Sequence, residues 1–183
     1  MESQVKGNSF RTLLAAVGAL RSAGTRQRVE CALPEDIRRM LAGVVAGGWY
    51  PMSAYGRMHG TIARVCATGE AFARDLGRHT SQQDLKGFAR LVFTFASPRQ
   101  ALGAAARIAP KYFRGTDLTV VDATPQSATL RCAGFAGSNA LMWAEFGGGL
   151  EPLLEAAGGK AVRVHRLDGG GDSPDAEFAL HWL

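Results

Sequence analysis

The residues of this chain that could do chemistry form no catalytic motif that we can identify. Gly147–Gly149 and Gly169–Gly171 do not fit the G-x-G-x-x-G pattern that follows a strand in dinucleotide-binding proteins, and Gly159-Lys160 lacks the rest of a P-loop. Ser138 is not part of a G-x-S-x-G nucleophile elbow, and the sequence has no H-E-x-x-H zinc motif. We therefore assign the glycines to turns and helix breaks and Ser138 to helix capping, and we expect no enzymatic activity.

The three cysteines give no metal or disulfide pattern either. Cys31, Cys66 and Cys132 lie far apart, and their number is odd, so they form neither a disulfide framework nor a C-x-x-C pair. We expect reduced, mostly buried thiols in the cytosol. Metal ligation together with one of the four histidines is an alternative. The sequence points to no particular cofactor.

Aromatic and other soft side chains are concentrated between residues 49 and 95. Most must belong to the core, but some could line an apolar cavity in which a few polar groups orient a ligand. Tyr55, His59 and His79 are the candidate polar groups, although each histidine could instead be a hydrogen-bonded core residue or a ligand to haem or a metal. The candidate ligand-binding residues are Trp49, Tyr50, Tyr55, Met58, His59, Phe72, Leu76, His79 and Phe88.

Apolar residues recur at helical spacing through the first two thirds of the chain. The first helix should begin at the potential N-caps Asn8 and Ser9 and continue to Gly24. Ser81 could cap a helix that reaches Phe95, and Ser97 with Gln100 resembles a capping box. The expected helices cover residues 9–24, 34–43, 51–67, 70–80, 81–95 and 97–110.

After Gly115 the period changes to the alternation that is typical of strands. Residues 118–132 predict one hairpin, and residues 161–167 and 177–182 predict another. A helix over residues 138–157, loosened by Gly147–Gly149, should separate them. We therefore predict an α+β fold of a single domain, residues 1–183. Its N-terminal helices should pack on a four-stranded, mainly antiparallel sheet that the C-terminal hairpins form.

The charge changes sign near the same boundary. Residues 1–115 carry 17 Lys and Arg against 7 Asp and Glu, whereas residues 116–183 carry 4 against 9. The arginines are dispersed singly, so we do not expect nucleic-acid binding, and the asymmetry would also suit an acidic partner or self-association. Apolar stretches are too short for a membrane span and the start lacks the order of a signal peptide, so we expect a cytoplasmic protein.

Several short motifs, in their order and spacing, resemble a myxobacterial paralogous family of unknown function. The resemblance covers about residues 5–182 and is carried by Trp49-Tyr50-Pro51, Asp75-Leu76-Gly77-Arg78, Ser97-Pro98, Lys111-Tyr112-Phe113-Arg114-Gly115, Gly134-Phe135, Gly147-Gly148-Gly149 and Phe178-Ala179-Leu180-His181-Trp182. That family is similar to the superfamily of 4-vinyl-reductase-type, haem nitric-oxide-binding-like and TRAPP vesicle-tethering domains. The resemblance implies helices on an antiparallel sheet around a hydrophobic cavity, used to bind a small hydrophobic molecule or to dimerise.

The leading hypothesis from the sequence is a non-enzymatic ligand-binding or sensory domain. Its apolar pocket should lie between the helices that carry residues 49–95 and the inner face of the sheet, and its partner is then a small hydrophobic molecule. A dimerisation or scaffold module, acting through its surface as a homodimer, is the alternative. Haem binding and nucleic-acid binding are further alternatives.

Overall fold

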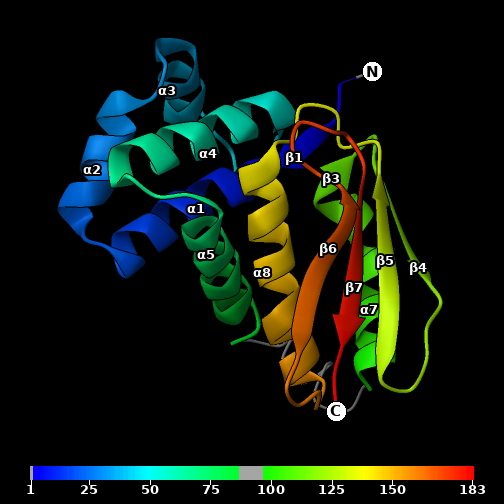
Figure 1. The fold of residues 1–183 in the computed structure, drawn as a ribbon. Coiled ribbons are helices and arrows are strands. Elements are labelled where there is room, and N and C mark those ends of the chain that lie inside the picture. The colour runs from blue at the N-terminus through cyan, green and yellow to red at the C-terminus, as the bar shows by residue number, and fades with distance from the viewer. Residues whose placement is uncertain (1, 87–96) are drawn as a thin grey trace.

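The computed structural model describes residues 2–86 and 97–183, and it places a helical part beside a C-terminal sheet, with helix α8 between them (Figure 1). The helices are α1 (Gly7–Leu20), α2 (Ala23–Ala32), α3 (Glu35–Ala42), α4 (Met52–Cys66), α5 (Glu70–Asp84), α7 (Pro98–Ile108), the short 3-10 helix η1 (Ala109–Lys111) and α8 (Ala140–Ala156). The strands are β1 (Gln4–Lys6), β2 (Trp49–Pro51), β3 (Phe113–Arg114), β4 (Asp117–Val121), β5 (Ser127–Ala133), β6 (Arg163–Gly169) and β7 (Ala176–His181). None of the described helices has the length and apolarity of a membrane span.

The four C-terminal strands form the sheet that the sequence predicts. Its order is β4-β5-β7-β6, and every neighbouring pair is antiparallel. Leu130 lies between Val120 and Phe178 in the register, and the alternation of buried and exposed residues along β5 and β7 directs one face inward. Helix α8 packs near β6 and helix α7 near β4, so both helices cover the sheet (Figure 1). The α+β prediction is therefore confirmed.

A second, three-stranded sheet was not predicted. Its order is β2-β1-β3, and its strands are two or three residues long, too short to show an alternating pattern. Val5 in β1 is fully buried. The ring of Trp49 in β2 contacts two cations, Lys6 at 3.9 Å and Arg114 at 4.1 Å from its centroid. Through this sheet the N-terminal strand β1 pairs with β3, the strand that directly precedes the C-terminal four-stranded sheet.

The start of α1 shows why the predicted N-caps were wrong. The helix begins at Gly7, before Asn8 and Ser9, and has no side-chain cap. The backbone N–H groups of Gly7 and Asn8 instead donate to the carbonyl oxygens of Gly48 and Ala46, each at 3.0 Å. A distant loop therefore satisfies the first turn, which no local motif could indicate.

Helix boundaries within the sequence follow the capping signals only in part. The box of Ser97 and Gln100 at the start of α7 is confirmed, with both reciprocal bonds present. Ser81, in contrast, starts no helix, because α5 continues through it to Asp84. Helix α2, which Ser22 caps by accepting from the N–H of Thr25 at 3.0 Å, was missed. The expected helix up to Phe95 falls mostly outside the described residues.

Helix α8 corrects the interpretation of the glycine run. The helix is continuous through Gly147–Gly149, and its N-cap is Asn139, whose side chain accepts from the N–H of Met142 at 3.0 Å, rather than Ser138. The hydroxyl of Ser138 donates instead to the carbonyl oxygen of Ser173, at 2.9 Å. The run neither breaks the helix nor caps it.

The glycines of α8 are required by its contact with α5. A Cβ atom on Gly148 would overlap the carbonyl oxygen of Arg74, and a Cβ on Gly77 of α5 would overlap the carbonyl oxygen of Glu145. Each helix thus supplies one glycine that lies directly against the backbone of the other. Any side chain at either position would force the helices apart.

An ion-pair cluster lies beside this contact. Glu151 of α8 is buried and binds Arg74 and Arg78 of α5, and Arg78 also binds Glu155 at 2.6 Å. Arg74 donates further to the carbonyl oxygen of Val164 in β6 at 2.9 Å. The cluster joins two helices and the sheet, and Glu151 has a full set of cationic partners.

The glycine contact leads to a stability prediction. Gly148→Ala should lower the free energy of unfolding by about 2 kcal/mol, because the added methyl group overpacks a backbone contact. The matched control is Gly60→Ala in α4, where the new Cβ would meet nothing within 4 Å; it should raise stability by about 0.5 to 1 kcal/mol. Urea denaturation followed by circular dichroism measures both. Equal effects of the two substitutions would contradict the close contact.

Candidate functional site

A cavity of about 400 Å³ lies at the junction of the helices and the sheet. Its walls come from α5, α7 and α8, from the inner face of β4 and β5, and from the ends of α1 and α4. The described residues that line it include Thr12, Tyr55, Thr80, Ala105, Phe113, Leu130, Phe135, Ser138, Met142, Trp143, Glu145 and Phe146. Most of the surface that these walls present is apolar.

Aromatic rings form one wall of the cavity. Phe135 packs against Phe113 at 5.3 Å between ring centroids and against Trp143 at 5.1 Å, and Trp143 in turn contacts Phe146 at 6.1 Å. Phe146 continues the cluster to Phe178 in β7, at 5.6 Å. The rings come from a strand, a loop, a helix and the sheet, so the wall holds the junction together as well as lining it.

One polar group stands out in this apolar surface. Glu145 of α8 accepts a hydrogen bond from the hydroxyl of Tyr55 at 2.8 Å through Oε1, and its Oε2 lies 3.0 Å from Nε2 of His59. Tyr55 and His59 are one turn apart on α4, so both side chains reach the same carboxylate. Burial, together with the charge of Glu145, raises the pKa of Tyr55 well above its ordinary value. Tyr55 is therefore a neutral donor.

In the structure, the nine candidate residues predicted from the sequence do not lie together in one site. Tyr55 lines the cavity, and His59 lies behind it against Glu145. Met58 and Leu76 are buried in the main core. Their role in ligand binding stays a prediction.

The other candidates lie away from this cavity. Trp49 and Tyr50 belong to the small sheet, where the Tyr50 hydroxyl accepts from the N–H of Val45 at 2.8 Å. Phe72 and His79 line a separate surface hollow beside Arg21. Phe88 lies outside the described residues.

Sequence reasoning missed the residues that contribute most to the cavity wall. Phe135, Trp143 and Phe146 follow residue 130, whereas the aromatic concentration from which the candidates were predicted ends at residue 95. A signal was present: Glu145 and Glu151 are carboxylates inside an otherwise apolar helical segment, and a buried carboxylate is retained only where something binds it.

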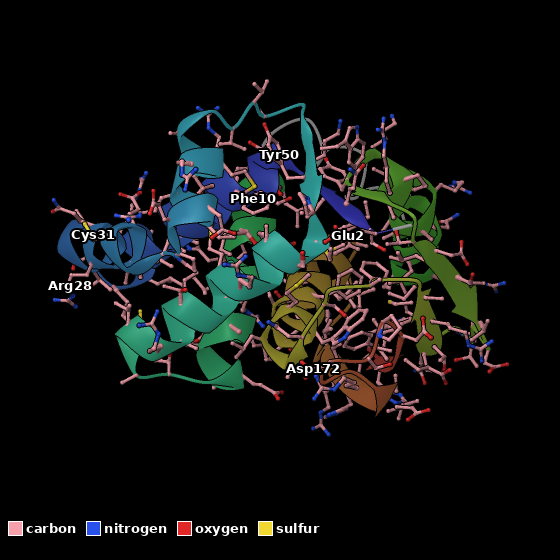
Figure 2. All side chains as sticks on the ribbon, turned by 90° about the horizontal axis from the view of Figure 1, so that it is seen from above. Glu2, Phe10, Arg28, Cys31, Tyr50 and Asp172 are labelled. Atoms are coloured by element: carbon pink, nitrogen blue, oxygen red, sulfur yellow. The ribbon has the colours of Figure 1, made fainter. Side chains whose placement is uncertain are left out.

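The three thiols are distributed differently from the expectation. Cys132 is buried in β5, Cys66 is partly exposed and Cys31 is exposed at the outer end of the helical part (Figure 2), so one thiol of the three is buried. Burial raises the pKa of Cys132 to about 12. Within residues 2–86 and 97–183, no group of three or more His, Cys, Asp or Glu side chains is arranged to hold a metal ion.

The fold defined by this arrangement is that of H-NOX domains. An unliganded Fe(II) H-NOX protein from K. algicida superposes with a TM-score of 0.74 at 13% identity, covering 97% of this chain and 96% of that one. An H-NOX protein from S. oneidensis in the Fe(II)NO state gives 0.67 at 12% identity, with 97% and 99% covered. An oxygen-binding H-NOX domain related to soluble guanylate cyclases gives 0.66 at 12% identity, with 96% and 92% covered. At such identities the likeness shows the fold alone.

The sequence itself matches no protein-family model and no curated protein. The H-NOX fold and the residues that line the cavity are therefore the features from which a function can be inferred.

The residues of this cavity do not fit haem. Iron in haem is held by His, Cys or Tyr, or by Met together with His. The described lining contains no His or Cys, so Met142 has no histidine to accompany it there, and the sequence of residues 87–96 contains none of the four types. Tyr55 is a neutral donor to Glu145, with a pKa raised by burial, and Tyr112 is 47% exposed. The described lining also has no Arg, Lys or His to pair with the two propionates of haem.

The Tyr55–Glu145 contact leads to a prediction about alkaline titration. Because burial and Glu145 both oppose ionisation, the folded protein should keep Tyr55 protonated at pH 10, the ordinary tyrosine pKa being about 10. The absorbance titration at 295 nm should then be the same for the wild type and Tyr55→Phe up to pH 10, and should differ only at higher pH. A difference that develops around pH 10 or below would show that Tyr55 is solvated.

The distribution of the thiols predicts their order of modification. A thiol-specific disulfide reagent should label Cys31 in the native protein and leave Cys132 unlabelled until the chain is unfolded, because only a thiolate that the reagent can reach will react. Peptide mass spectrometry identifies the modified residue, and Cys31→Ser should remove the fast phase. Labelling of Cys132 at the rate of Cys31 would contradict the buried position.

Proposed function

We propose that this chain is a non-enzymatic ligand-binding domain of a sensory or regulatory kind, and that it binds a small hydrophobic molecule in the cavity between α8, α7 and the sheet. The single observation that supports the proposal most is the cavity itself, about 400 Å³ in volume and walled by Phe113, Phe135, Trp143 and Phe146. Ligand cavities of a few hundred Å³ with mainly aromatic and apolar walls are typical of small-molecule sites.

The fold agrees with this proposal. The H-NOX proteins described above are gas-binding in two of the structures, one as an oxygen complex and one with NO on Fe(II). This chain has their fold, but the described residues of its cavity do not fit haem. A binding domain that uses the same architecture for a different small molecule reconciles the two observations.

The proposed domain comprises the whole chain and works in a reducing compartment, the cytoplasm, because its cysteines are free and distributed over separate elements.

A homodimer has less support. The large exposed apolar side chains among the described residues belong to different elements: Leu20, Val45, Ile108, Tyr112, Leu167 and Leu183. They give a dimer interface no specific location.

Filling the cavity tests the proposal. Ala105 of α7 lines the cavity, so Ala105→Phe should place a ring inside it and weaken binding of the neutral fluorescent probe N-phenyl-1-naphthylamine by about tenfold or more, equivalent to about 1.4 kcal/mol. Wild-type protein should show saturable probe fluorescence. Titration of the probe at fixed protein concentration measures both affinities.

The matched control is Gly103→Phe, on the same helix. A Cβ there would meet nothing within 4 Å, so the added ring points away from the cavity and probe affinity should remain that of the wild type. If Ala105→Phe folds and binds the probe as tightly as the wild type, the cavity is not the binding site. If the wild type shows no saturable binding, the proposed function is wrong.

A further inference from the structure

Two carboxylates of helix α8 have opposite surroundings. The side chains of Glu145 and Glu151 are 14% and 10% exposed, so both are largely removed from water. Glu151 is neutralised by Arg74 and Arg78. Glu145 has no Arg or Lys partner within the described part of the chain; it contacts the neutral hydroxyl of Tyr55 and the ring of His59, which is charged only when protonated.

A buried carboxylate without a permanent cation is costly. Each oxygen of Glu145 uses one of its acceptor positions for Tyr55 or His59, and a carboxylate has about four such positions in total. Glu145 also lines the cavity. It therefore retains the capacity to accept further hydrogen bonds at a place that a ligand can reach.

Five other polar side chains of the cavity wall already donate their hydrogens within the protein. The hydroxyls of Thr12 and Thr80 donate to helix carbonyl oxygens at 3.2 and 3.0 Å, and those of Tyr55 and Ser138 donate to Glu145 and to the carbonyl oxygen of Ser173. The indole N–H of Trp143 also donates to the Ser173 carbonyl, at 3.1 Å. The four hydroxyls among them still offer a ligand acceptor positions, and the hydroxyls of Ser9, Ser81 and Tyr112 also line the cavity.

The charged side chains in the described part of the cavity wall are acidic. The ionisable lining residues of the described structure include the carboxylates Asp84 and Glu145, and they include no Arg, Lys or His. A ligand that ends in a carboxylate would face like charge, and the described lining offers it neutral hydroxyls but no cationic donor to compensate for its desolvation. A ligand that ends in a cationic donor would form a charge-assisted hydrogen bond to Glu145.

From these observations we infer that the cavity takes an apolar molecule that ends in a protonated amine, with Glu145 as the group that receives the amine. The inference rests on the proposed function, that the cavity binds a small hydrophobic molecule, and names the chemical class of that molecule. The aromatic wall of Phe135, Trp143 and Phe146 would then hold the apolar part.

Three probes of equal chain length test the inference: octylamine, 1-octanol and octanoate. At neutral pH, where the amine is protonated and the acid ionised, the wild type should bind octylamine at least tenfold more tightly than octanoate, with octanol between them. Displacement of N-phenyl-1-naphthylamine measures the three affinities. This order needs no substitution, so it is a test even if a variant fails to fold.

Glu145→Gln keeps an acceptor for Tyr55 and removes the charge. It should weaken octylamine binding about tenfold and leave octanol binding within twofold. The matched control is Glu155→Gln, which removes a charge from an exposed position of the same helix outside the described lining, and should change neither affinity by more than twofold.

The outcomes separate the two proposals. If the three probes bind equally, if octanoate binds most tightly, or if Glu145→Gln binds the amine like the wild type, the amine inference is overturned while the cavity remains a binding site. If none of the three probes displaces N-phenyl-1-naphthylamine, the inference is also overturned. If N-phenyl-1-naphthylamine itself shows no saturable binding, the proposed function is overturned together with the inference.

Discussion

The direct backbone contact between α5 and α8 is the constraint on which most of this structure depends. Because Gly77 and Gly148 have no side chains, the two helices approach until each glycine lies against a carbonyl group of the other helix. That separation brings Arg74 and Arg78 within reach of Glu151. It also fixes the rotation of α8, so that Glu145 faces α4 while Trp143 and Phe146 face the sheet. The cavity is the space that remains when α8 is held in this position.

The fold could be predicted to a large extent because most of its elements carry a local signal. The capping box at Ser97, the alternation along residues 118–132 and the acidic first turn after Pro34 each agree with the structure. The small sheet and the start of α1 could not be predicted, since their hydrogen bonds join segments far apart in the chain. Lys6, for example, pairs with Trp49 across β1 and β2. No local pattern encodes such a pairing.

The candidate site was predicted less well than the fold. An apolar seam between the helices and the sheet was expected, and Tyr55 among the nine candidates lines the cavity there. The other wall residues come mainly from α1, α5, α7, α8, the sheet and the loop before α8. Their convergence depends on the packing of these elements, which the spacing of aromatic residues does not report. The run Gly147–Gly149 was interpreted as a helix break because glycine has low helix propensity. In the structure, tertiary packing overrides that propensity.

The reciprocal glycine contact also limits how this chain can diverge. A larger residue at position 77 or 148 cannot be accommodated by rotating a side chain, since the obstacle is backbone on the opposite helix. A substitution at either position would therefore require α5 and α8 to move apart. That movement would change both the shape of the cavity and the position of Glu145. Descendants that keep the same ligand should retain both glycines even where the lining residues vary, so this pair is a marker by which such relatives could be recognised.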